Sequence, residues 1–176
     1  LGVISFSGNT IAESPLSKDK EQIKNAINQI QISSVGGTDI FEAVSNSIRL
    51  LRNEKNKAVI LLSDGQINVG GIDETINYAT SNEVVIYAIG IGTISGGDTS
   101  YGMSKLDSDT LKSLSYNTNG KYFNAETKNE MKTSFSELAS VTRKEGSIDL
   151  SLYLIITAII FFVIKEFLLS INKVIW

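Results

Sequence analysis

One run of residues limits what this chain can fold into more than any other. Residues 58–62 read Ala-Val-Ile-Leu-Leu and are followed at once by Ser63, Asp64 and Gly65. An apolar, partly β-branched run of this length predicts a buried strand of a parallel sheet that helices cover. In open sheets of this kind, ligands bind outside the carboxyl ends of the strands. The Asp-Gly that ends the run is therefore a candidate site.

A second candidate lies upstream, where Gly36, Gly37, Thr38 and Asp39 form a glycine turn that opens a helix. Hydroxyl and carboxylate oxygens are the ligands that Mg²⁺ prefers in proteins. The two segments together predict a divalent-metal site at one edge of the sheet. Each also has a purely structural interpretation, because Thr38 is a good helix N-cap and Asp-Gly favours turns.

The composition removes several classes of site. The 176 residues include no Cys and no His, which excludes disulfides, thiolate metal ligands and a Ser-His-Asp triad. A metal in this chain must be held by oxygen atoms. The formal net charge of −3 provides no basic field, so nucleic acid is not expected as a partner.

Strands and helices alternate along the first part of the chain, which predicts parallel β-α-β units. The fold class we expect is α/β, with a Rossmann-like, mostly parallel sheet flanked by helices. The expected strands are residues 2–6, 11–13, 57–63, 83–92 and 120–124; the expected helices begin at Ser17 and after Thr38 and cover 72–81, 107–116 and 127–141; residues 93–104 are expected to form a Gly/Ser-rich loop.

Three of the expected helices carry apolar residues at three- and four-residue spacing, which predicts one buried face on each. These faces are Ile23, Ala26, Ile27 and Ile30; Phe41, Val44, Ile48 and Leu51; and Met131, Phe135, Leu138 and Val141 or Thr142.

The C-terminal part has a different composition. Residues 150–164 carry no charge and would form roughly 22 Å of helix, short of the ~30 Å hydrocarbon core unless the helix continues past Lys165. We expect a linker at 143–149, a transmembrane helix at 150–172 and a tail at 173–176. The alternative is a buried or interfacial helix. The side of the membrane stays open, because basic residues flank both ends.

The order of the motifs resembles the von Willebrand factor type A (vWA) domain over residues 1–142. Residues 2–8 (GVISFSG) are similar to its second strand, 36–39 (GGTD) to its metal-site threonine loop, 61–65 (LLSDG) to its metal-site aspartate loop, and 85–92 (VIYAIGIG) to its fifth strand. With the apolar C-terminal segment, the chain is similar to membrane-anchored bacterial and archaeal vWA proteins of the aerotolerance (Bat) type.

The resemblance implies a metal-ion-dependent adhesion site in which Thr38 and Asp64 are ligands of Mg²⁺, with Mn²⁺ and Ca²⁺ as alternatives. Five further residues would shape the loops or support the ligands: Gly36, Gly37, Asp39, Ser63 and Gly65. The family's Asp-x-Ser-x-Ser motif does not occur in this sequence. We expect the family's first strand and helix to precede Gly2, and that strand to lie between 2–6 and 57–63. Metal binding is therefore expected in the complete protein, with the fragment folding poorly and binding metal weakly.

The function that the resemblance implies is a membrane-anchored binding module and not an enzyme. A carboxylate from an unidentified protein ligand would complete the metal coordination, and membrane lipid would surround the C-terminal helix. Candidate partners are a MoxR-type AAA+ ATPase or other vWA proteins. Two alternatives stay open: a structural membrane protein with a non-functional metal site, and a Mg²⁺-dependent hydrolase that uses Asp64 and Asp39, although two-metal sites need clustered carboxylates.

Overall fold

A computed structural model describes residues 1–33, 35–68, 70–93, 96–99, 102–145, 155–157 and 159–160. The chain divides into two units, residues 1–136 and residues 137–176. The first unit contains all the strands that the structure describes and both candidate loops.

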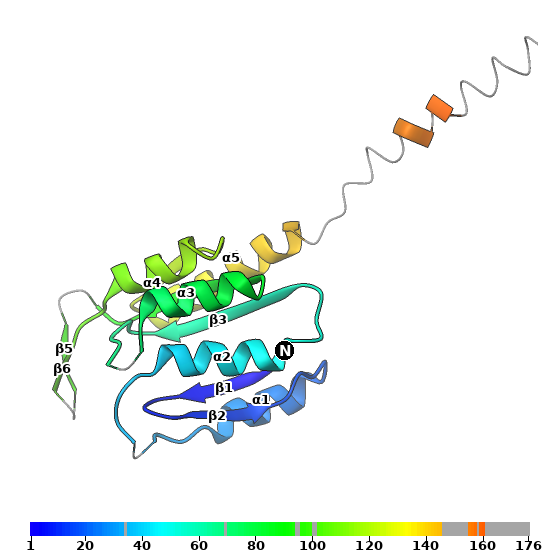
Figure 1. Cartoon of the computed structure of the whole chain (residues 1–176). Coiled ribbons are helices and arrows are strands. Elements are labelled where there is room, and N and C mark those ends of the chain that lie inside the picture. The colour runs from blue at the N-terminus through cyan, green and yellow to red at the C-terminus, as the bar shows by residue number, and fades with distance from the viewer. Residues whose placement is uncertain are drawn as a thin grey trace, which may run out of the picture. The chain divides into compact units, whose positions relative to one another are not determined.

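The centre of the first unit is a parallel sheet of three strands in the order β3-β4-β7, of which β3 is labelled in Figure 1. The strands are β3 (Lys57–Ser63), β4 (Val84–Ile91) and β7 (Tyr122–Ala125). β3 and β4 pair along the whole of β3, from Lys57 opposite Val84 to Ser63 opposite Gly90. The α/β class and the parallel pairing of the two apolar runs are therefore confirmed. The carboxyl ends of β3 and β4 lie side by side.

A separate antiparallel hairpin is formed by β1 (Val3–Phe6) and β2 (Thr10–Ser14). Among the described residues, β1 and β3 form no ladder with each other, although they run in the same direction in Figure 1. Helix α2 (Ile40–Leu50) contacts β1, β2 and β3 and so connects the hairpin to the parallel sheet.

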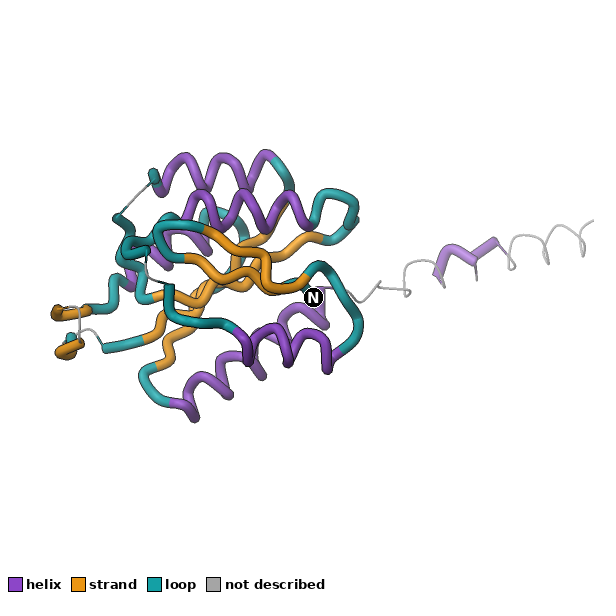
Figure 2. Tube along the Cα trace, turned by 90° about the horizontal axis from the view of Figure 1, so that it is seen from below, coloured by secondary structure: helices purple, strands orange, loops and turns teal. Residues whose placement is uncertain are grey.

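Helices lie on both sides of the strands (Figure 2). Helix α2 contacts α3 (Ile72–Ser81), and α3 contacts α4 (Ser108–Tyr116), while α1 (Lys20–Gln29) packs against β1 and β2. Helix α5 covers Lys128–Glu145. α1 begins one turn later than Ser17 suggested, because the Asp19 carboxylate accepts hydrogen bonds from the Glu21 and Gln22 amides and caps the helix there.

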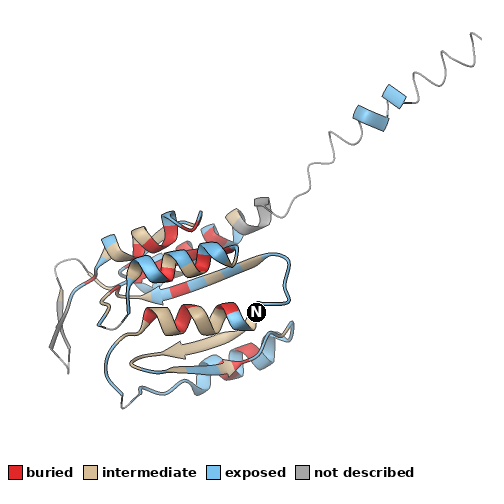
Figure 3. Cartoon of the chain, viewed as in Figure 1, coloured by how far each residue is buried: buried red, intermediate tan, exposed pale blue. Residues whose placement is uncertain are grey.

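The core gathers where α2, α3 and α4 meet the parallel sheet, and its residues are among those coloured as buried in Figure 3. It consists of Ile40, Val44, Ile48, Leu61, Ala79, Val84, Ile86, Ala88, Leu106, Leu111 and Leu114. β4 is buried along nearly its whole length. β3 is not, because Leu61 faces the core while Ile60 and Leu62 are 36% and 37% exposed. The prediction that β3 is buried on both faces is therefore wrong: its second face is left open within the part of the chain that the structure describes.

Other local expectations also fail for reasons of packing. In α1, Ile23 and Ala26 are buried, but Ile27 and Ile30 are 51% and 41% exposed, so the buried face is narrower than the apolar spacing. In α5, Phe135 is 40% exposed. The expected loop at 93–104 contains a short antiparallel hairpin, β5 (Gly97–Thr99) with β6 (Gly102–Ser104).

Most of the expected transmembrane segment, 150–172, lies outside the described residues. The described residues within it, 155–157 and 159–160, are helical, and their four isoleucines are exposed. No helix in the described part of the chain is both long and apolar enough to span a bilayer.

Candidate functional site

The Thr38 loop leads directly into α2. Asp39 has an extended backbone, with φ −103° and ψ 90°, and its carboxylate accepts a hydrogen bond from the Glu42 amide at 2.8 Å. Asp39 is therefore the N-cap of α2, as expected for a carboxylate at the positive end of a helix. The alternative in which Thr38 caps this helix is wrong. Thr38 lies one residue before the cap and is half-buried.

The Asp64 loop is held in shape by its own side chains. The Ser63 hydroxyl accepts a hydrogen bond from the Gly65 amide at 3.0 Å, and one Asp64 carboxylate oxygen accepts one from the Gln66 amide at 3.1 Å. The Asp64 carbonyl accepts a hydrogen bond from the Asp107 amide at 2.8 Å, which attaches the loop to the start of α4.

Gly65 is required for this arrangement. Its φ is +78°, in the region that side chains rarely adopt, and a Cβ atom there would collide with the Asp107 carbonyl. The sequence Ser63-Asp64-Gly65 therefore encodes a tight turn as well as a possible ligand. Both interpretations of Asp-Gly remain compatible with the structure.

The two candidate loops are joined by a main-chain hydrogen bond. The Asn68 amide, four residues after Asp64, donates to the Thr38 carbonyl at 3.2 Å. A third segment joins them, because the Asp39 amide donates to the carbonyl of Ser7 in the β1–β2 turn at 2.9 Å. Three segments that are far apart in the sequence thus meet beyond the carboxyl ends of β1 and β3.

Gly36 and Gly37 directly precede Thr38 in the chain. A side chain at Gly8 of the β1–β2 turn would collide with the Gly36 carbonyl, so the glycine turn and the β1–β2 turn are in close contact. All of the residues named as candidates from the sequence thus lie in two segments, 36–39 and 63–65, and the Asn68 amide links the first of these to the residues that follow the second.

The donor chemistry at this edge suits a hard cation. A threonine hydroxyl and an aspartate carboxylate are oxygen ligands of the kind that Mg²⁺ binds, with water filling further positions. Within the described ranges, no group of three or more His, Cys, Asp or Glu side chains could hold a metal ion. A metal at Thr38 and Asp64 would therefore take other oxygen ligands as well.

Two residues at the edge had no role in the sequence-based hypothesis. The Gln66 side chain donates through Nε2 to the Lys105 carbonyl at 2.7 Å, and Asn68 donates through its backbone to Thr38. For Gln66, the available sequence signal was its position two residues after Asp64. The contact of Asn68 uses a main-chain atom and so has no signature in the residue type.

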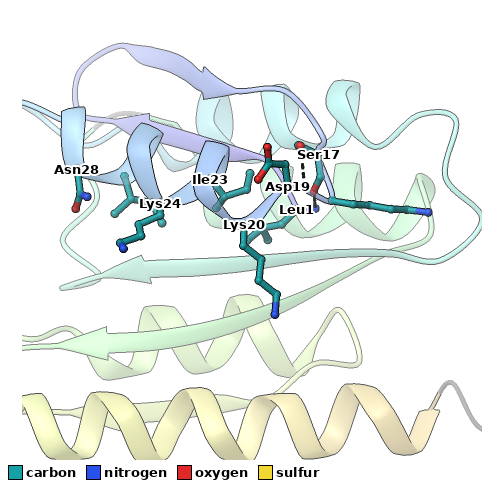
Figure 4. Close-up of a pocket in the computed structure, with 9 residues that line it drawn as sticks. Leu1, Ser17, Asp19, Lys20, Ile23, Lys24 and Asn28 are labelled. Atoms are coloured by element: carbon teal, nitrogen blue, oxygen red, sulfur yellow. Dashed lines mark hydrogen bonds between the residues drawn. The ribbon is translucent and has the colours of Figure 1, made fainter.

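Two hollows lie elsewhere in the first unit. One, of about 320 Å³, follows α1, where Leu1, Ile23 and Ile27 form an apolar lining beside Lys20 and Lys24 (Figure 4). The Leu1 nitrogen donates to the Ser17 carbonyl beside it at 2.9 Å. The other, of about 340 Å³, lies between the β1–β2 hairpin and Arg49 of α2. Neither is lined by Thr38 or Asp64.

A parallel sheet flanked by helices, with two loops joined by a main-chain hydrogen bond beyond the end of β3, defines an α/β domain of the Rossmann-like class. The von Willebrand factor type A domain family matches residues 1–137. The chain therefore belongs to the von Willebrand factor type A domain family.

Solved structures share this fold. The conserved hypothetical protein BatB from Bacteroides thetaiotaomicron superposes with a TM-score of 0.70 and 22% identity, over 81% of this chain and 78% of that one. An aerotolerance-related membrane protein from Bacteroides fragilis superposes with a TM-score of 0.69 and 18% identity, again over 81% of this chain and 78% of that one. A von Willebrand factor type A protein from Catenulispora acidiphila superposes with a TM-score of 0.63 and 17% identity, over 78% of this chain and 32% of that one.

Among curated proteins, an uncharacterized protein from Borreliella burgdorferi is 28% identical over 98 residues. The match covers 53% of this chain and 29% of that protein. The chain thus spans less than a third of the length of this relative.

Proposed function

We propose that this chain is a membrane-anchored vWA binding module, and not an enzyme, in which Thr38 and Asp64 bind Mg²⁺ and a carboxylate of a partner protein completes the coordination. The observation that carries the proposal is the hydrogen bond from the Asn68 amide to the Thr38 carbonyl, which ties the Asp64 loop to the Thr38 loop. Candidate partners are a MoxR-type AAA+ ATPase or another vWA protein.

The chemistry follows from the small number of protein ligands. A cation held by one hydroxyl and one carboxylate keeps positions that water fills, and a hard cation exchanges water for a carboxylate oxygen. Binding of an acidic side chain would then depend on the metal. Because the chain has no His, it lacks the commonest general base at neutral pH, which disfavours the hydrolase alternative.

The metal assignment is tested with Thr38→Ala and Asp64→Asn. The asparagine keeps the oxygen that accepts from the Gln66 amide, so the turn survives while the charge is lost. Asp109→Asn is the matched control, because the Asp109 side chain is 93% exposed on α4 and pairs only with Lys112 in the salt bridges found. Isothermal titration calorimetry with Mg²⁺ should show weaker binding for the first two variants and unchanged binding for the control. Equal binding by all the proteins would refute the assignment and favour a structural role.

The anchor is tested separately. A chain without residues 148–176 should leave the membrane fraction, whereas the 176-residue chain should remain in it after a high-salt wash. Retention of the shortened chain in membranes would show that this segment is not the sole anchor.

A further inference from the structure

Asp39 lies at the point where the loops of the candidate edge meet. Its carboxylate caps α2 through the Glu42 amide at 2.8 Å, and its own amide donates to the Ser7 carbonyl at 2.9 Å. Its carbonyl accepts from the Ala43 amide at 3.2 Å. Asp39 therefore makes contacts through its side chain and through both of its main-chain polar groups.

The segment after Asp64 closes over this residue. Gly70 has a φ of +85°, and a Cβ atom there would lie 3.4 Å from an Asp39 carboxylate oxygen and 3.1 Å from the Phe41 Cβ. Two residues earlier, the Asn68 amide donates to the Thr38 carbonyl. Residues 68–70 thus lie against Thr38 and the first turn of α2.

We propose that Asp39 is a positioning residue that fixes Thr38 for the metal, and that it is not itself a ligand. The inference rests on the proposed metal site. A carboxylate already bonded to the first turn of α2 stiffens the backbone on one side of Thr38, and Ser7 and Asn68 hold it from two other directions. Supporting contacts of this kind orient metal ligands, and their loss weakens metal binding by about 10- to 100-fold.

Three variants separate positioning from ligation and from helix capping alone. Asp39→Asn keeps a side-chain oxygen for the cap but removes the charge, and Asp39→Ala removes both. Asp19→Ala is the matched control, because Asp19 caps α1 in the same way, through the Glu21 amide at 2.9 Å, and contacts neither candidate loop. Asp39→Ala and Asp19→Ala should lose similar amounts of folding stability. A difference in metal affinity between them therefore reports on the site.

The probe is Mn²⁺, followed by paramagnetic broadening of the backbone amide signals of Thr38 and Gly65 in the complete protein that contains these residues. Asp39→Ala should weaken the apparent affinity for Mn²⁺ by about 10-fold or more. The affinities of Asp39→Asn and Asp19→Ala should stay close to that of the unmodified protein. If Asp39→Asn binds as weakly as Asp39→Ala, the charge itself is needed and Asp39 is a ligand. If Asp39→Ala binds like the unmodified chain, Asp39 serves the helix alone. Either result overturns the proposal.

Hydrogen exchange of the Asn68 amide provides a readout that needs no metal. This amide donates to the Thr38 carbonyl, so it should exchange faster in Asp39→Ala than in Asp19→Ala at equal global stability. If the unmodified complete protein binds no Mn²⁺, the proposed function fails, and the Asn68 amide still decides whether Asp39 positions Thr38. Equal exchange rates in the two alanine variants would refute positioning.

Discussion

Thr118 offers a quantitative test of how the core is held together. It is 4% exposed, and its hydroxyl oxygen accepts a hydrogen bond from the Ile86 amide at 3.0 Å. The hydroxyl also lies within donating distance of the Leu114 carbonyl, at 2.8 Å. The ladder between β4 and β7 begins only at Ala88, so Thr118 supplies the acceptor that a strand would otherwise give to Ile86.

Replacing Thr118 by Val keeps the shape and leaves the buried Ile86 amide without this acceptor. A buried donor without a partner costs about 1–3 kcal/mol, and one additional buried methyl group returns about 0.8 kcal/mol. The expected net loss is therefore about 0.2–2 kcal/mol in the free energy of unfolding. Thr118→Ser is the control, because it keeps the hydroxyl and loses a methyl group worth about 0.8 kcal/mol.

The assay combines urea unfolding, followed by circular dichroism, with hydrogen exchange of the Ile86 amide. The two variants have overlapping stabilities, but the Ile86 amide should exchange faster than its β4 neighbours in the valine variant alone. A valine variant as stable as the unmodified chain, with Ile86 still protected, would refute the role assigned to the hydroxyl.

Three further predictions concern the same unit. Gly65→Ala should lower the free energy of unfolding by about 1–3 kcal/mol in urea, because the added Cβ combines an unfavourable φ with a collision at Asp107. Glu83→Gly should raise the melting temperature, since Glu83 has a φ of 56° that costs a non-glycine residue about 1–2 kcal/mol. The pKa of Tyr122 is raised above 10.0, first by burial and then by Tyr116, Asp109 and Glu126. The unfolded chain therefore ionises first, stability should fall as the pH rises above 10, and Tyr122→Phe should weaken that decrease in alkaline urea titrations.

The local pattern of the chain predicted the elements that are defined by their own residues. The apolar runs of β3 and β4 indicated parallel strands because both are partly β-branched and are followed by Asp or Gly, and β3 pairs with β4 along its whole length. Asp107 and Asp39 both act as N-caps because a carboxylate before a helix can accept from its free amides.

Exposure was harder to predict, because it depends on which element lies opposite. Ile60 and Leu62 are as apolar as Leu61, and Ile27 continues the spacing of Ile23, yet only Leu61 and Ile23 are buried. Hydrophobic spacing shows which face a strand or helix can bury. It does not show whether another segment covers that face, which is a property of the whole packing.

At the candidate edge, the side chains were visible to sequence reasoning and the main-chain contacts were not. The side chains of Thr38 and Asp64 could be proposed as ligands because their chemistry is visible in the sequence. The bond that joins their loops runs through the Asn68 amide, and the Asp39 amide attaches the Thr38 loop to the β1–β2 turn. Main-chain bonds survive substitution of the side chains beside them. Thr38→Ala can therefore remove a donor oxygen without breaking the Asn68–Thr38 contact, and its effect on metal binding reports on the hydroxyl alone. Asp64 differs, because its carboxylate also shapes its own turn, so only the asparagine substitution separates charge from structure there.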